Sequence, residues 1–312
     1  MTHYTVRLSG PDVRSGRISA GVLRDLLDVL VEGSRRALRF RMEGRSTARG
    51  TPPAWLGAAS AFEVVGLTEG STLIEIEAPE LQGAFGNLLP QLGPFEPMEP
   101  RSTGLTLFAE SLADAIAGDA DSDRYDNGLL QKFQELSRVF ERGVGALELT
   151  ERNGPAGRSG LTIRPEALES IEKLQQQTPP SQHVRVAGRL DAIRHSDRMF
   201  ALILESGTTL RGVAEGFPPE AMAGLFGQAV IVSGTASFRP SGRVQAIEAE
   251  RIEKAEGDFT LWAAEPRPLL PSLLRKDLQR EQGPRSGLGA VIGAWPGEET
   301  DEEVRAVLRS LS

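Results

Sequence analysis

The start of the chain carries a strand pattern followed by a helix pattern. Apolar and polar side chains alternate over residues 4–8, which predicts a β-strand, and Gly10 and Pro11 predict a turn after it. Beyond Ser19, a residue suited to cap a helix N-terminus, apolar residues recur at intervals of three and four up to Leu38. This spacing predicts an amphipathic helix of about five turns.

A β-hairpin is predicted next, after a loop that carries Trp55. Two strand-like segments flank a short polar turn: residues 62–67 and 72–77. In the second segment the side chains alternate between two faces, so one pair is expected in the core and the other on the surface. The pairs are Ile74 with Ile76 and Glu75 with Glu77.

The rest of the first 178 residues mixes helix and strand patterns. A loop rich in proline and glycine is predicted over residues 86–103. Helices are predicted over 105–116, 129–140 and 166–174, and strands over 147–149 and 161–163. Thr178-Pro179-Pro180 is typical of a domain boundary. We therefore predict an α+β domain over residues 1–178.

The pattern then changes to closely spaced strands. Five are predicted: residues 184–193, 199–204, 209–213, 230–236 and 244–252. A short helix is predicted over 218–226, between the third strand and the fourth. This element order resembles an OB-fold, and Gly188 looks like the glycine that allows the first strand of such barrels to bend. The second predicted domain is thus a small all-β, OB-like barrel over residues 183–255.

Composition narrows the classes of function. The chain has 312 residues, a formal charge of −8 and no cysteine, which excludes disulfides, thiolate metal sites and cysteine nucleophiles. It contains no run of 18 apolar residues, and the first residues lack the basic-then-apolar pattern of a signal peptide. We expect a cytoplasmic protein with no membrane partner.

Residues 256–312 are predicted to be a linker and a tail that ends in a short helix. Thr300 and Glu303 form a capping box, and an apolar stripe follows at helical spacing. The stripe consists of Val304, Val307, Leu308 and Leu311. A helix this short is marginal alone in water, so it needs an apolar surface, either on this chain's own body or on a partner. The preceding Trp295-Pro296-Gly297 turn favours a partner, because an exposed aromatic side chain is a typical anchor at interfaces.

The tail resembles the C-terminal tails of bacterial antitoxin-type proteins paired with PIN-domain ribonuclease toxins. The run that carries the resemblance is Gly293 to Glu303, including the Trp-Pro-Gly turn and the acidic residues after it. The resemblance implies an antitoxin-like or adaptor protein that binds and neutralises such a ribonuclease. The implied partner-binding residues are Trp295, Pro296, Gly297, Glu298, Glu299, Thr300, Val304, Val307, Leu308 and Leu311.

Nucleic-acid binding by the barrel is the alternative. Arginines that could contact phosphates occur in the first predicted helix and in the barrel. They are Arg35, Arg36, Arg39, Arg189, Arg211 and Arg243. Bases bound by OB-folds usually stack on aromatic side chains, but the barrel's phenylalanines occupy positions that look like core. These are Phe200, Phe217, Phe226 and Phe238.

No pattern in the sequence indicates catalysis. The loop Asp119 to Asp123 resembles the start of a calcium loop, but Arg124 and Leu130 stand where an EF-hand needs glycine and glutamate. The three histidines have no partner at metal-ligand spacing, and no phosphate-loop, nucleophile-elbow or dinucleotide fingerprint occurs. We expect no catalytic residue, metal or cofactor.

Overall fold

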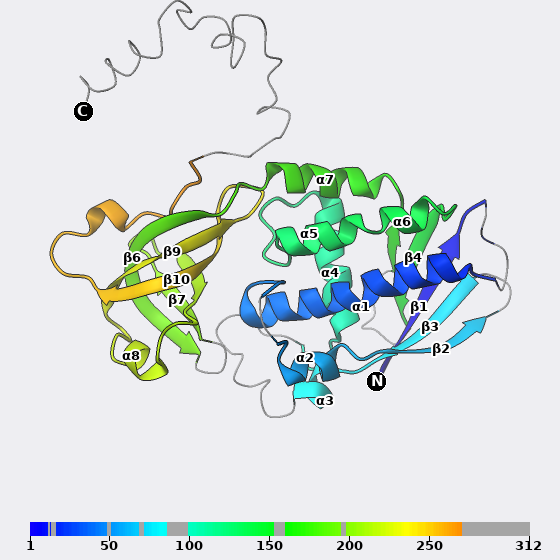
Figure 1. Ribbon diagram of the computed structural model, residues 1–312, viewed down its shortest axis with the longest axis horizontal. Helices are drawn as coiled ribbons and strands as arrows, with labels where there is room; N and C mark the ends of the chain where they lie inside the picture. The colour runs from blue at the N-terminus through cyan, green and yellow to red at the C-terminus, as the bar shows by residue number, and fades with distance from the viewer. Residues whose placement is uncertain are drawn as a thin grey trace, which may run out of the picture. The chain divides into compact units, whose positions relative to one another are not determined.

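The computed structural model describes residues 1–11, 13, 17–48, 51–68, 72–85, 99–152, 160–194 and 198–269. These residues form a mixed α+β fold with an antiparallel sheet, a set of helices and a closed β-barrel (Figure 1). The predicted tail helix and its partner-binding residues lie outside the described residues. Within the described part, no helix is both long enough and apolar enough to cross a bilayer.

The first half of the chain builds a five-stranded sheet in the order β2-β3-β1-β4-β5. Its strands are β1 (Thr2–Ser9), β2 (Glu63–Thr68), β3 (Thr72–Ala78), β4 (Ala146–Glu151) and β5 (Leu161–Ile163). All neighbouring strands are antiparallel. The predicted alternation in β3 is confirmed, because Ile74 and Ile76 are fully buried while Glu75 and Glu77 lie on the opposite face.

Helices cover the apolar face of this sheet (Figure 1). They are α1 (Ala20–Glu43), α2 (Ala54–Ala59), α3 (Leu81–Phe85), α4 (Gly104–Ala117), α5 (Asn127–Gln134), α6 (Ser137–Phe140) and α7 (Ala167–Gln177). The Tyr4 hydroxyl joins β1 to the start of α4 through Thr103 Oγ1 at 2.8 Å and Thr106 Oγ1 at 2.7 Å. Sheet and helices therefore share one buried core.

Helix α1 begins where the sequence predicts and ends later. The Ser19 hydroxyl accepts a first-turn N–H at 3.2 Å, which confirms the cap. The helix has 24 residues, more than the predicted five turns. Phe40 and Met42 in the last turns are buried, and Arg39 and Glu43 add an ion pair of 2.7 Å at i,i+4 spacing, so the helix continues beyond the predicted stripe. Gly44 then stops it with a φ of 72°, a left-handed conformation that favours glycine.

Two predictions about the helical region are wrong. The loop expected to carry Trp55 contains the short helix α2, whose Trp55 ring packs 5.1 Å from Phe85 of α3. The single helix predicted over 129–140 is divided into α5 and α6. The reason lies in tertiary packing: Phe133, Leu136 and Val139 are all buried at a spacing of three, which suits the tighter winding of a 3₁₀ turn.

The second half of the described chain forms a closed five-stranded barrel. Its elements are β6 (Gln182–Arg194), β7 (Met199–Ile203), β8 (Thr209–Val213), α8 (Pro219–Ala223), β9 (Ala229–Phe238) and β10 (Val244–Lys254). Each element is present where the sequence predicts it. The barrel order is β10-β8-β7-β6-β9, and β10 closes it by pairing with β9 antiparallel and with β8 parallel. A side chain at Gly188 would come within 2.7 Å of the Ile203 carbonyl oxygen, so close strand approach requires this glycine.

The predicted boundary lies between α7, which ends at Gln177, and β6, which begins at Gln182. The described residues on both sides of it belong to one compact unit. Beyond the barrel, the segment before residue 269 is attached to β6. The Gln182 side chain donates to the Arg267 carbonyl at 2.9 Å and accepts the Leu269 N–H at 3.0 Å.

Strand packing in the barrel also requires glycine at position 234. A methyl group at Gly234 would lie 2.1 Å from the Glu248 carbonyl oxygen and 2.9 Å from the Ala249 Cα, both of which are backbone atoms. We predict that Gly234→Ala lowers the free energy of unfolding by about 1–3 kcal/mol, the usual cost of overpacking. The matched control is Gly216→Ala, where the methyl group meets no atom within 4 Å. Urea denaturation compares the two, and equal midpoints would contradict the packing argument.

Candidate functional site

The outer surface of the barrel carries a small apolar cluster on two neighbouring strands. It consists of Met199, Ala201 and Val213, with Ala192 packed beside them, and it is separate from the barrel's interior core. Met199 is only 2% exposed although its side chain lies outside the barrel core. Its methyl carbon lies 3.4 Å from where a side chain at Gly44 would begin, so the end of α1 covers this cluster.

Polar contacts reinforce the junction between α1 and the barrel. The Arg194 guanidinium donates to the carbonyl oxygen of Met42, in the last turn of α1. Such carbonyls have no partner within the helix and carry partial negative charge, so an arginine is well suited to bind there. Arg45, just after α1, forms ion pairs with Glu215 and Glu248 beyond β8 and on β10.

A second contact joins the loop after α4 to the turn between β9 and β10. The Ser241 N–H donates to the Ala120 carbonyl at 3.2 Å, and Arg239 Nη1 donates to the Asp121 carbonyl. The Tyr125 hydroxyl donates to the Asp119 carbonyl and so fixes the loop from inside. The acidic loop that resembles a calcium site in the sequence thus binds the barrel through its main-chain carbonyls.

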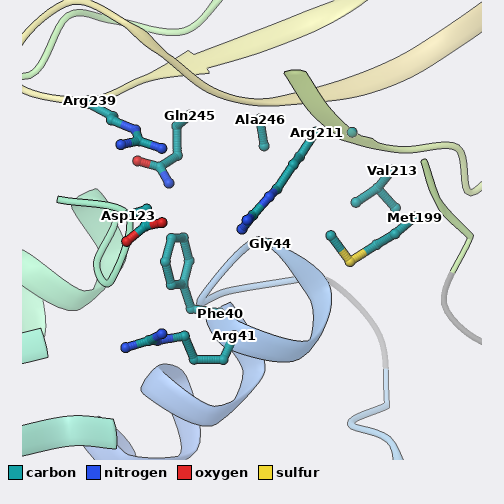
Figure 2. Close-up of a pocket in the computed structure, with 11 residues that line it drawn as sticks. Phe40, Arg41, Gly44, Asp123, Met199, Arg211, Val213, Arg239, Gln245 and Ala246 are labelled. Atoms are coloured by element: carbon teal, nitrogen blue, oxygen red, sulfur yellow. The ribbon is translucent and has the colours of Figure 1, made fainter. Parts of the chain in front are cut away.

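These contacts enclose a pocket of about 20 Å³, room for about one water molecule in the present arrangement (Figure 2). Its walls come from α1, the loop after α4 and the barrel strands. The lining residues are Phe40, Arg41, Gly44, Asp123, Met199, Arg211, Gly212, Val213, Arg239, Gln245 and Ala246. Three arginines therefore face one aspartate at this junction.

The three arginines that line the pocket differ in their exposure and in their hydrogen-bond and ion-pair partners. Arg41 is 6% exposed and pairs with Glu110 at 3.3 Å. Arg211 is half-buried and makes no hydrogen bond or ion pair with the described residues. In Figure 2 its guanidinium extends from β8 towards Phe40 and Gly44, with Arg239 on another wall of the pocket.

Arg239 has a perturbed pKa at this junction. Burial lowers its pKa, and the positive charges of Arg243 and Arg211 act in the same direction, whereas Asp123 and Asp121 oppose them. Its Nε is buried and has no hydrogen-bond partner within the described part of the chain. The pocket therefore concentrates positive charge that the neighbouring side chains do not fully balance.

The arginines predicted to contact nucleic acid are not gathered into one surface. On α1, Arg36 pairs with Glu32 at 3.0 Å and Arg39 pairs with Glu43 at 2.7 Å. Arg35 lies 3.8 Å from the same Glu32. All three are thus engaged by acids of their own helix.

The three barrel arginines predicted to contact nucleic acid do not share one surface either. Arg189 pairs with Asp191 at 3.0 Å, and Arg243 lies 3.9 Å from Glu265. Arg211 alone among the six lines the pocket. Sequence reasoning missed its neighbour Arg239 as a site residue. The signal that could have found it is the turn between β9 and β10, which carries an arginine at each end.

The prediction that the barrel's phenylalanines are core residues holds for three of the four. Phe200 and Phe238 are buried, and Phe217 packs against the barrel core. Phe226 is 58% exposed, so its assignment to the core is wrong. It lies in the turns after α8, whereas Met222 within α8 and Leu225 after it pack at the barrel core.

The described residues contain no group of three or more histidine, aspartate or glutamate side chains placed to hold a metal ion. No protein-family model matches the chain, and a comparison with curated proteins finds no match.

The loop that contacts the barrel provides a pH test. Burial raises the pKa of Tyr125 above its ordinary value of 10.0, and the Asp119 and Asp114 carboxylates add to the shift. We predict that Tyr125 ionises at higher pH in the folded protein than in the unfolded chain. The unfolded chain then loses its proton first, so the stability that Tyr125 contributes is present below pH 10 and lost as the pH rises further.

Absorbance of tyrosinate measures this ionisation directly. The chain has two tyrosines, so Tyr4→Phe leaves Tyr125 as the one tyrosine whose ionisation the absorbance reports, and Tyr125→Phe removes that contribution. The outcome against the prediction is a Tyr4→Phe protein whose remaining tyrosine ionises at the same pH folded and in denaturant.

Proposed function

We propose that this chain is a non-catalytic binding protein that recognises a protein partner through residues 285–312. The observation that carries the proposal is the sequence pattern of the final residues, which predicts a Trp-Pro-Gly turn followed by a capped amphipathic helix. Four apolar side chains on one face of such a helix each gain about 1.5–3 kcal/mol when they are buried. A groove on another protein would supply that burial.

The partner class that we propose is a PIN-type ribonuclease, with this chain as its antitoxin-like or adaptor partner. The proposal rests on the resemblance of residues 293–303 to antitoxin tails. The acidic residues Glu298, Glu299 and Asp301 would compete with RNA phosphates for a basic groove beside the nuclease site. Such a partner places the protein in the cytoplasm.

We further propose that the barrel is of the OB type. Around the barrel its strands follow the order first, second, third, fifth and fourth, and a helix lies between the third strand and the fourth. OB-folds bind nucleic acid over the second and third strands and the adjoining loops. Here those strands are β7 and β8, and Met199 and Val213 on their outer side are buried.

This cover counts against the alternative function, nucleic-acid binding by the barrel. The end of α1 and the loop after α4 contact the strands and the turn where a nucleic acid would lie. Five of the six predicted arginine contacts also lie within 4.0 Å of carboxylates of this chain. The body is therefore better suited to carry the tail than to bind an oligonucleotide over this face.

The tail can be tested with one matched pair of variants in the full chain. Leu308→Asp places a charge on the apolar stripe, whereas Ala306→Asp places the same charge on the opposite side of the predicted helix. We predict that Leu308→Asp weakens partner binding at least about tenfold, because about 1.5–3 kcal/mol of burial is lost. Ala306→Asp should bind like the unmodified chain. Co-purification from the source organism, followed by mass spectrometry, identifies and quantifies the bound protein.

The binding role of the tail and the identity of the partner are tested separately. If the captured partner is not a PIN-domain ribonuclease, the assignment of the partner is wrong and the binding role stands. If Leu308→Asp and deletion of residues 285–312 both retain the same partner as the unmodified chain, the binding role of the tail is itself wrong.

A further inference from the structure

We propose that the pocket between the end of α1 and the barrel binds a phosphate group through Arg211 and Arg239. The first observation is the state of Arg211. Its guanidinium faces the pocket, is half-buried and makes no hydrogen bond or ion pair with the described residues. A charged group that is withdrawn from water is normally paired, because an unpaired one loses hydration without compensation.

The second observation is the state of Arg239, which reaches the pocket from the turn between β9 and β10. Nη1 is engaged by the Asp121 carbonyl, but Nε is buried and has no partner within the described residues. Arg211 on β8 and Arg239 in the turn between β9 and β10 thus both have unpaired donors at this pocket. An oxyanion supplies the acceptors that both lack.

The charges that line the pocket favour an anion. Arg41, Arg211 and Arg239 face it together with one carboxylate, that of Asp123. Glu110 balances Arg41 at 3.3 Å, which leaves two arginines against one aspartate. Gln245 adds a side-chain amide that can donate to a ligand oxygen.

The presence of several arginines at this junction has a competing explanation in the C-terminal end of α1. Its last carbonyls attract positive charge, and this accounts for Arg194, which binds the Met42 carbonyl. It does not account for Arg239, whose hydrogen bond is made to the loop after α4 instead. The competing explanation predicts that Arg211 stabilises the fold equally in phosphate and in chloride of the same ionic strength.

The size of the pocket limits the ligand to a small group. A volume of about 20 Å³ has no space for a base or a sugar, and binding of a phosphate requires the flexible Arg211 side chain to shift and widen the pocket. The geometry of a guanidinium suits phosphate, because two N–H groups bind two oxygens of one phosphate. The phosphate could be free or could be the terminal group of an oligonucleotide, and the two sources share this chemistry.

The test uses the full chain and inorganic phosphate. Thermal unfolding is followed in phosphate and in chloride of equal ionic strength, and phosphate affinity is measured by calorimetry. A ligand that binds only the folded state raises the unfolding temperature with its concentration. We expect this rise in the unmodified chain, and at least a tenfold loss of phosphate affinity in Arg211→Gln and in Arg239→Gln.

The matched control is Arg251→Gln, which removes an arginine that is exposed on β10 and pairs with Glu253 at 2.5 Å. It should keep the unmodified affinity. If Arg211→Gln does not fold, Arg211→Lys serves as the second variant. It keeps the positive charge but cannot make the bidentate hydrogen bonds of a guanidinium. It should weaken phosphate binding while its unfolding temperature in chloride stays unchanged.

A comparison of oligonucleotides with and without a 5′-phosphate identifies the source of the group. Tighter binding of the phosphorylated strand assigns the pocket to a strand end, and equal binding assigns it to free phosphate. The proposal is overturned if phosphate gives no stabilisation beyond chloride. It is equally overturned if Arg211→Gln or Arg211→Lys binds phosphate as the unmodified chain does. Deletion of residues 285–312 should leave phosphate binding intact, so this result is independent of the proposed tail function.

Discussion

The contact between the last turn of α1 and the outer side of β7 and β8 is the interaction on which the described structure depends. Met199 and Val213 are apolar side chains outside the barrel's interior, so the barrel alone would expose them to water. The end of α1 removes them from water, and Arg194 satisfies a carbonyl that the helix leaves unpaired. One contact therefore buries an apolar surface of the barrel and completes a helix of the α+β part.

The same contact shapes the candidate site. The helix end and the barrel meet closely at Met199, while the long side chains of Arg211 and Arg239 hold the surfaces apart beside it. Burial and the like charges of neighbouring arginines make the position of Arg239 costly for a cation, as its lowered pKa indicates. A buried cation whose pKa is lowered in this way is more typical of a binding site than of a side chain that only fills space in the core.

Much of the fold follows from the sequence, because hydrophobic periodicity reports local structure. The five barrel strands, the hairpin and the Ser19 cap are found where pattern and turn residues place them. The break between α5 and α6 depends on burial at every third residue, a choice that tertiary packing makes. The pocket could not be predicted, since Arg41, Asp123 and Arg239 are brought together only by the junction between distant segments.

Closure of the barrel by its last strand has a consequence for synthesis. β10 pairs with both β8 and β9, so the ring cannot close until residues up to about Lys254 have left the ribosome. Until then the edges of β8 and β9 carry unpaired backbone groups, which are templates for wrong pairing. The α+β part, whose strands are complete at Ile163, has emerged by then, and the end of α1 can already shield β7 and β8. The order of elements along the chain thus protects the nascent barrel.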